Sequence, residues 1–215
     1  MADTREKAGT AKAEAAEADE PRGRGRPRCA SAHRAILDAA AELLETLDYQ
    51  DITIERIAAQ AKVGKPTIYR WWKTKADLFL EFYREESLRR LPEFDPTDDA
   101  ITDLEDHLKR LFRIHRSRPV AQGFRALIAE GQIDPAFREN FSERLLSLRR
   151  SYLYDIIAHG KKTGQFHKNV DGDLMVDVLL GAFWYRLLAA DRKPYNNDYA
   201  ENIVALVRPY LQTGK

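Results

Sequence analysis

The chain has 215 residues, of which 44% are hydrophobic and 32% charged, and its formal net charge at pH 7 is +1. Abundant Ala, Leu, Glu, Lys and Arg, with few Gly and Pro beyond the N-terminal region, favour an all-α fold of one or two domains. No apolar run is long enough for a membrane span or a signal peptide, and one cysteine excludes a disulfide framework. We therefore expect a cytoplasmic protein without membrane contact.

The first 29 residues are predicted to be a disordered tail that carries a basic arm. Residues 1–20 contain no Leu, Ile, Val or aromatic side chain, so they cannot bury enough apolar surface to become ordered. Residues 21–28 read P-R-G-R-G-R-P-R, and the R-G-R-P run matches the core of an AT-hook, whose arginines enter the minor groove of A·T-rich DNA. The alternative is a solvated tail in which Arg24 and Arg26 touch phosphates without reading sequence. Cys29, beside the arm, is either an oxidant-sensing thiol or an inert one.

Two helices are predicted over residues 31–61. Ser31 is a candidate N-cap for the first helix, which ends near Leu47, and Thr53 is a candidate N-cap for the second. Both helices carry an apolar stripe at the three-and-four spacing that buries one helix face. The stripes consist of Ile36, Ala39, Ala40, Leu43, Leu44 and Leu47 in the first helix, and of Ile54, Ile57, Ala58 and Ala61 in the second.

A third, very short helix is predicted after a tight turn at residues 62–64. Pro66 suits the first turn of this helix, because its missing N–H would be unpaired there in any case. Two short helices joined by a tight turn form a helix-turn-helix, which presents the N-terminal residues of its second helix to the major groove of DNA. The sequence therefore predicts a DNA-binding unit that ends near Trp72.

Polar and flat side chains of the third helix are candidates for DNA contact. Arg70 can fork onto O6 and N7 of guanine, and is the residue that we expect to read sequence. Thr67 can place its methyl group against thymine or its hydroxyl on a phosphate, and Lys65 can reach either a base or a phosphate. Trp71 is expected to contact the DNA backbone or the bases.

Three runs between Ala35 and Leu80 carry a resemblance to a known family. They read I-L-D-A-A-A-E-L-L, T-I-E-R-I-A and G-K-P-T-I-Y-R-W-W-K-T-K-A-D-L. Together they resemble the N-terminal domain of the TetR family of bacterial transcriptional regulators. The resemblance implies a DNA-binding domain at residues 30–76, after the tail at 1–29, and a helical ligand-binding and dimerisation domain at 77–215.

The charge distribution agrees with this division. Residues 21–80 carry 11 basic and 7 acidic side chains, whereas residues 81–215 carry 21 of each. Positive charge is thus concentrated around the helix-turn-helix, as a surface that binds phosphates requires.

The resemblance also assigns roles around the third helix. Tyr69 and Lys75 stand where members of the family hold phosphates, and Thr53 is a further phosphate candidate at the start of its own helix. Trp72 matches an aromatic core position. Lys62 stands where the family commonly has Gly, and a left-handed backbone there would cost a lysine about 1 kcal/mol.

Helices are predicted along the remainder of the chain, with a break at residues 92–97. The expected helices cover residues 73–91, 101–116, 124–131, 135–159, 171–190 and 198–211. The inward face of the long helix from Pro135 is expected to consist of Phe137, Phe141, Leu145, Leu148, Tyr152 and Ile156. Gly160 and Gly164 are expected at its frayed end.

The resemblance implies that this second domain binds a small molecule, whose binding changes the angle between two DNA-reading heads. The alternative for each candidate residue is ordinary core packing. The candidates are Phe112, His115, Phe124, Leu127, Phe141, Tyr152, Trp184 and Tyr185. Arginines that would meet an anionic ligand, if they point inward, are Arg113, Arg116, Arg125 and Arg186.

In the family, the last two helices form a homodimer as a four-helix bundle shared by two subunits. We expect the same use here, and the alternative is that these helices only close the core of the monomer. The candidate interface residues are Leu180, Gly181, Trp184, Val204 and Val207.

No catalytic, metal or cofactor site is predicted, because the five histidines are scattered and no Gly-rich phosphate loop or nucleophile elbow is present. We therefore predict a homodimeric repressor that a small-molecule effector releases from a palindromic operator in double-stranded DNA. One alternative is an effector-independent architectural DNA-binding dimer that uses its basic arm on A·T-rich DNA. Another is a small-molecule binder or enzyme whose helix-turn-helix is vestigial.

Overall fold

The computed structural model describes residues 26–90, 95–189 and 196–214, and within these ranges all regular structure is helical. This confirms the all-α fold class. No helix of the described part is both long and apolar enough to cross a membrane. The α-helices are α1 (Arg26–Thr46), α2 (Ile54–Gln60), α3 (Lys65–Trp71), α4 (Lys75–Arg90), α5 (Ala100–Ile114), α6 (Arg118–Ile133), α7 (Pro135–Phe141), α8 (Ser147–Lys162), α9 (Gly172–Leu188) and α10 (Asn197–Thr213).

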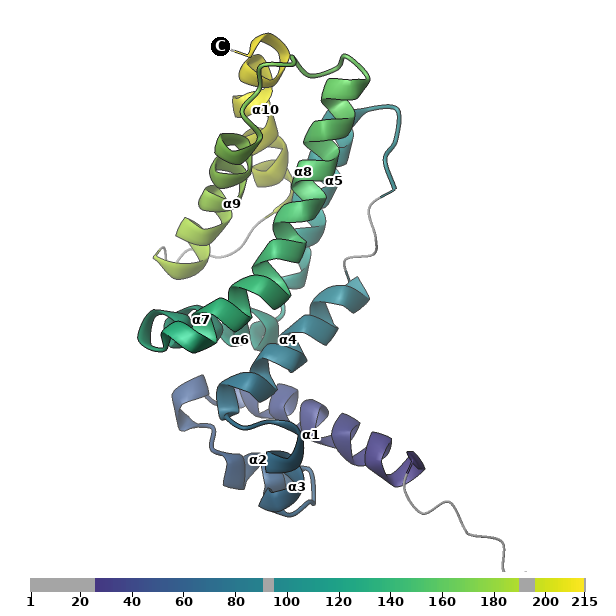
Figure 1. Ribbon diagram of the computed structural model, residues 1–215. Coiled ribbons are helices and arrows are strands. Elements are labelled where there is room, and N and C mark those ends of the chain that lie inside the picture. Colours follow the sequence, from purple (N-terminus) through teal and green to yellow (C-terminus); the bar gives the residue numbers. More distant parts are fainter. Residues whose placement is uncertain (1–25, 91–94, 190–195, 215) are drawn as a thin grey trace, which may run out of the picture.

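The helices form a small N-terminal body and a larger C-terminal one. Helices α2 and α3 lie at one end of the molecule and α10 at the other, with α4 running obliquely between them (Figure 1). Helix α5 packs against both α8 and α10. Helices α1 and α4 both pack against α6, so the N-terminal body has two helical contacts with the same neighbour.

The N-terminal body packs around the stripes predicted from the sequence. Ile36, Ala40 and Leu44 of α1 are fully buried, as are Ile57 of α2 and Ile68 of α3. Short polar contacts fasten this body to α6.

In one such contact, the Tyr49 hydroxyl donates to Glu130 at 3.0 Å; in another, the Gln122 amide donates to Asp48 at 3.0 Å. Burial is the main cause of a raised pKa of Tyr49, with a smaller contribution from Glu130. The phenol therefore stays protonated and keeps donating.

Helix α1 begins earlier than the sequence indicated. Its first residue is Arg26, five positions before the expected N-cap at Ser31. Pro27 is compatible with this start because proline fits the first turn of a helix. The last residues of the predicted basic arm therefore have helical backbone, whereas Arg24 and the predicted disordered tail lie outside the described residues.

The long helix predicted from Pro135 is interrupted by a π-helical turn at Ser142–Leu146, which separates α7 from α8. A π turn contains more residues per turn than an α-helix and so shifts the following side chains around the helix axis. Phe137, Phe141, Leu145 and Ile156 are buried as predicted, but between Leu145 and Ile156 the buried side chains are those of Arg149 and Leu153.

Leu148 and Tyr152, which the sequence placed inward, are only half-buried. Their expected positions assumed regular α-helical spacing through the turn, and this expectation is wrong. The residue that replaces Leu148 on the inward face is a charged one.

Gly160 lies inside α8 and is buried, so the expected frayed end is not at this residue. A Cβ atom at this position would lie 2.3 Å from the Phe166 ring. Glycine is therefore required for the close approach of this ring to the helix. The helix ends at Lys162, and Gly164 follows with a φ of 77°.

Candidate nucleic-acid interface and interior cavity

Helices α2 and α3 form the predicted helix-turn-helix. The Thr53 hydroxyl caps α2 by accepting a hydrogen bond from the Arg56 N–H at 3.3 Å, as expected for an N-cap. Lys62, in the turn, has a φ of 55°, which is the left-handed conformation that favours glycine. Gly64 precedes α3 with extended backbone and no side-chain cap, and Pro66 occupies the first turn.

One edge of α3 is exposed while the other holds the helix in place. Ile68 is fully buried, whereas Lys65, Tyr69 and Arg70 are exposed and Thr67 is half-buried. The Lys65 ammonium lies 3.1 Å from Glu55 of α2, an ion pair on the surface. Within the part of the chain that the structure describes, Tyr69 and Arg70 have no ion pair or side-chain hydrogen bond, so both are available to a ligand.

Trp71 and Trp72 join α3 to α1 and α4. The Trp72 indole is buried and donates to Glu81 of α4 at 2.7 Å, and His33 of α1 lies 3.0 Å from the other oxygen of the same carboxylate. Trp71 is half-buried and packs edge-on against His33, with ring centroids 5.2 Å apart. Glu81 thus fixes the orientation of α3 relative to both neighbouring helices.

His33, Glu81 and Glu85 offer ligand atoms that all lie within 4.8 Å of one another, the spacing of a metal site. These groups are already engaged with protein partners. Glu81 accepts from His33 and the indole of Trp72, and Glu85 pairs with Arg34 at 3.2 Å. The arrangement is an ion-pair network between α1 and α4.

Lys75 lies at the start of α4 but points into the protein. Its ammonium donates to the carbonyl oxygens of Tyr49 and Ile52, both at 2.9 Å, and lies 4.0 Å from the centre of the Tyr49 ring. Burial is the main cause of a lowered pKa of Lys75. This structural role differs from the phosphate contact expected from the sequence.

Replacing Lys75 with methionine is expected to lower the free energy of unfolding by roughly 2 kcal/mol, because two carbonyl groups lose a charged donor. Lys73→Met is the control: Lys73 is exposed, and its substitution should change stability by less than about 0.5 kcal/mol. Urea unfolding measures both. An unchanged stability for Lys75→Met, with a salt slope of DNA binding reduced by about 0.9 for each bound subunit, would restore the phosphate role.

The predicted ligand-binding residues occupy three different environments. Phe112, Phe124, Leu127 and Phe141 are buried in the core. Trp184 is half-buried beside a cavity, while the Tyr185 side chain is 68% exposed and points away from the core. The structure thus brings only part of the expected set to a cavity.

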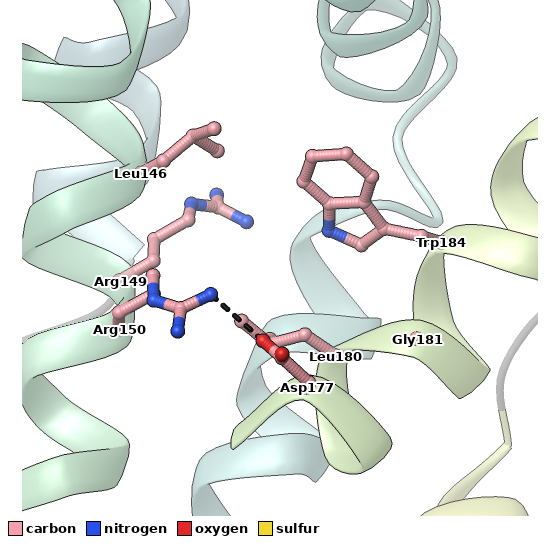
Figure 2. Close-up of a pocket in the computed structure, with 7 residues that line it drawn as sticks. All are labelled: Leu146, Arg149, Arg150, Asp177, Leu180, Gly181 and Trp184. Carbon is pink, nitrogen blue, oxygen red and sulfur yellow. Dashed lines mark hydrogen bonds and ion pairs between the residues drawn. The ribbon is translucent and has the colours of Figure 1, made fainter. Parts of the chain in front are cut away.

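A cavity of about 260 Å³ lies between α8 and α9. Figure 2 shows Leu146, Arg149 and Arg150 on one side and Leu180 and Trp184 on the other. Its remaining lining residues are Asp177 and Gly181.

Arg149 is not among the ligand-binding residues predicted from the sequence. A regular helix places this residue one position off the apolar face, and only the π turn brings it inside. Tyr152 lines a second, smaller hollow on the other side of Arg149, between α8 and α4.

His115 and Tyr83 form a buried polar pair next to Arg149. His115 donates from Nδ1 to the Leu111 carbonyl at 2.7 Å, so Nε2 accepts from the Tyr83 hydroxyl at 2.8 Å. Burial, followed by the charge of Arg149, holds the pKa of His115 well below its usual value. Burial also raises the pKa of Tyr83 to about 12. Both groups are therefore neutral at physiological pH.

The predicted interface residues of the last two helices are only partly on the surface. Val204 and Val207 are buried in the monomer at 0% and 6% exposure, so the structure moves them from the interface to the core. Gly181 faces open space, with no atom within 4 Å of where a Cβ would lie. We define the α9 stripe as the residues on this outer face of α9: Leu174, Val178, Gly181, Tyr185 and Leu188.

Two family models match the chain. The model described as "Bacterial regulatory proteins, tetR family" matches residues 36–82, which include α2 and α3. The model described as "Tetracyclin repressor-like, C-terminal domain" matches residues 94–207, which is more than half of the chain. The two matches lie on the N-terminal and C-terminal bodies of the fold.

Curated relatives match most of the chain. The HTH-type transcriptional regulator YdeS of Bacillus subtilis is 33% identical over 181 residues, which are 84% of this chain and 90% of YdeS. The HTH-type regulator Rv1556 of Mycobacterium tuberculosis is 25% identical and covers 82% of this chain and 86% of its own length.

Solved structures show the same fold. The crystal structure of the TetR family transcription regulator SCO0332 has a TM-score of 0.67 and 28% identity, covering 83% of this chain and 97% of SCO0332. FadR from B. subtilis has a TM-score of 0.64 and 22% identity, covering 85% of this chain and 99% of FadR.

Proposed function

Because the chain belongs to the TetR family of bacterial transcriptional regulators, we propose that it is a homodimeric repressor released from DNA by a small effector. Membership of this family means that the chain is a DNA-binding transcription regulator and not an enzyme. The proposal concerns its assembly, the sign of regulation and its response to a ligand.

The observation that carries the proposal is the exposed edge of α3. Arg70 and Tyr69 are exposed and unpaired within the described residues, while Ile68 and Trp72 of the same segment anchor it from the inside. A short helix with buried anchors and free donors is suited to the major groove, where arginine recognises guanine. We propose Arg70 as the main base contact and Lys65, Thr67, Tyr69 and Thr53 as supporting DNA contacts.

The α9 stripe supports assembly as a dimer. Its residues recur at spacings of three and four, and the side chains of Leu174, Tyr185 and Leu188 are 50%, 68% and 45% exposed. Leu206 of the adjacent α10 is 79% exposed. A contiguous apolar surface of this kind marks an interaction site, and a two-fold axis allows the same surface to pair with itself. A four-helix bundle of α9 and α10 from two subunits would cover it.

The cavity beside α8 and α9 supports the effector part of the proposal. FadR of B. subtilis, which shares this fold, has been solved in complex with stearoyl-CoA. Helix α4 passes from this body to the DNA-binding body, so a ligand that moves α4 changes the position of α3 (Figure 1). If the effector weakens DNA binding by some factor, thermodynamic linkage requires DNA to weaken effector binding by the same factor.

Selection of binding sites from random double-stranded DNA tests the proposal. A homodimeric regulator is expected to enrich a palindrome whose half-sites are roughly 34–36 Å apart, one turn of DNA. The architectural alternative, with the basic arm on A·T-rich tracts, predicts enrichment of such tracts without a palindrome. Selected DNA without two-fold symmetry would therefore contradict the repressor proposal and favour the alternative.

A further inference from the structure

We propose that the cavity between α8 and α9 binds an organic anion, a carboxylate on an apolar body, and that the guanidinium of Arg149 holds it. This inference rests on the proposed effector-dependent function and specifies the chemical class of the effector.

Arg149 is a buried cation without a counter-ion. Its side chain is part of the core at 6% exposure, its Nε has no hydrogen-bond partner, and its Nη2 donates to the Ser87 hydroxyl at 3.1 Å. No carboxylate of residues 26–90, 95–189 or 196–214 pairs with it. Burial lowers the pKa of Arg149, but a guanidinium stays protonated in proteins. Buried arginine is normally paired, so an anion from outside the described chain would complete this site.

The neighbours of Arg149 cannot take the place of that anion. The guanidinium lies 5.0 Å from the centre of the Tyr83 ring and 5.1 Å from that of Phe124, so it receives cation–π stabilisation from both. Tyr83 and the adjacent His115 are neutral, because burial raises the pKa of the phenol and lowers that of the imidazole. The surroundings therefore tolerate a cation without neutralising it.

The neighbouring Arg150 provides a contrast within the same cavity. Arg150 donates to Asp177 of α9 at 2.9 Å (Figure 2). It also donates to the Tyr154 hydroxyl at 2.8 Å. The Asp177 carboxylate thus neutralises Arg150. Arg149 remains the charged group at the cavity wall that has no counter-ion. Figure 2 shows its guanidinium extending from α8 into the space between Leu146 and Trp184.

The geometry favours a carboxylate over other anions. The planar fork of a guanidinium matches the two oxygens of a carboxylate, and the unpaired Nε lies on one edge of that fork. The apolar wall consists of Leu146, Leu180 and Trp184, which suits a hydrocarbon or aromatic body. The cavity volume of about 260 Å³ lies near the lower end of the roughly 300–1,000 Å³ that is usual for small-molecule sites, so it suits a small ligand.

Binding at this position would reach the DNA-binding body through α4. Ser87 and Tyr83, the present partners of the guanidinium, both belong to α4. A carboxylate competes with the Ser87 hydroxyl for the same donors, and charged acceptors bind them more strongly. The bound anion therefore weakens a link between α8 and α4.

The test measures binding of octanoate, decanoate, salicylate and 1-naphthoate to the full chain by calorimetry, each beside its primary amide. At least one carboxylate is expected to bind at least tenfold more tightly than its amide. Arg149→Met keeps an apolar stem and removes the charge, so it should reduce that affinity at least tenfold. Arg144→Met, which removes an exposed arginine that does not line the cavity, should reduce it less than threefold.

Thermal unfolding without ligand separates binding from a purely structural role. Removing an unpaired buried charge should leave the Tm of Arg149→Met at least as high as that of the wild type. A lower Tm, no carboxylate binding to the wild type, equal affinity for an amide, or equal losses in the two variants would each overturn the inference. Wild-type protein that binds its selected DNA but no carboxylate refutes only this inference, whereas failure to bind any DNA refutes the proposed function.

Discussion

Replacing Val178 with glutamate is expected to convert the protein from a dimer to a monomer and to lower its affinity for a two-half-site operator at least ~100-fold. Val178 is 40% exposed in the α9 stripe, so glutamate is accommodated in the folded monomer. In the proposed dimer the two-fold axis brings the substitution into the interface twice, and each carboxylate would be buried without a partner. A monomer keeps one reading head, and each base contact that is lost costs about 1–3 kcal/mol.

Sedimentation equilibrium at micromolar concentration and titration of operator DNA measure the two effects. Ile133→Glu is the matched control, because Ile133 is an 80% exposed apolar residue at the end of α6 and not part of the α9 stripe. This control should remain dimeric and bind the operator normally. A dimeric Val178→Glu variant would show that the subunits pair through another surface.

Replacing Arg70 with alanine is expected to remove most of the preference for operator over random DNA. A bidentate arginine–guanine contact discriminates by about 1–3 kcal/mol, and a dimer makes it twice, so operator affinity should fall by roughly 2–6 kcal/mol. Binding to random DNA should fall much less, because it depends on phosphate contacts.

The matched control is Lys73→Ala, which removes an exposed cation just beyond α3. We expect Lys73 to contact a phosphate in each subunit, so its loss should weaken operator and random DNA by the same factor and reduce the salt slope by about 1.8. Competition binding at several salt concentrations measures both variants. Equal losses on the two DNAs for Arg70→Ala would assign base recognition to another residue of α3.

The DNA-binding body could be predicted from the sequence because its signals are local. The hydroxyl cap at Thr53, the proline at the start of α3 and the apolar stripe of α2 each act within one helical turn, and the structure shows all three. The resemblance drew attention to Lys62, because the family commonly has Gly at this position, and the structure shows left-handed backbone there. Lys75 was predicted to hold a phosphate, whereas its ammonium donates to two backbone carbonyl groups. The sequence did not indicate this contact, because both acceptors are more than twenty residues away along the chain.

The effector site could be predicted less well because it depends on the relative rotation of helices. The spacing of apolar residues placed Leu148 inward, and nothing in the sequence indicated the π turn that brings Arg149 there instead. Helix α9 is apolar on more than one side, so its sequence did not distinguish the core face from the outer face. The arginines proposed for an anionic ligand therefore did not include the one that the structure buries without a counter-ion.

The π turn also affects how this chain should be compared with its relatives. A π turn holds one residue more than an α-helical turn between the same two flanks, so removing one exposed residue, such as Glu143, lets the helix become regular without rotating α8. Relatives that are one residue shorter at Ser142–Leu146 can thus keep the same side chains on the inward face. An alignment gap at this point would then leave the orientation of α8 unchanged. Homologous cavity residues should therefore be matched by counting backwards from Gly160 and not forwards from Pro135.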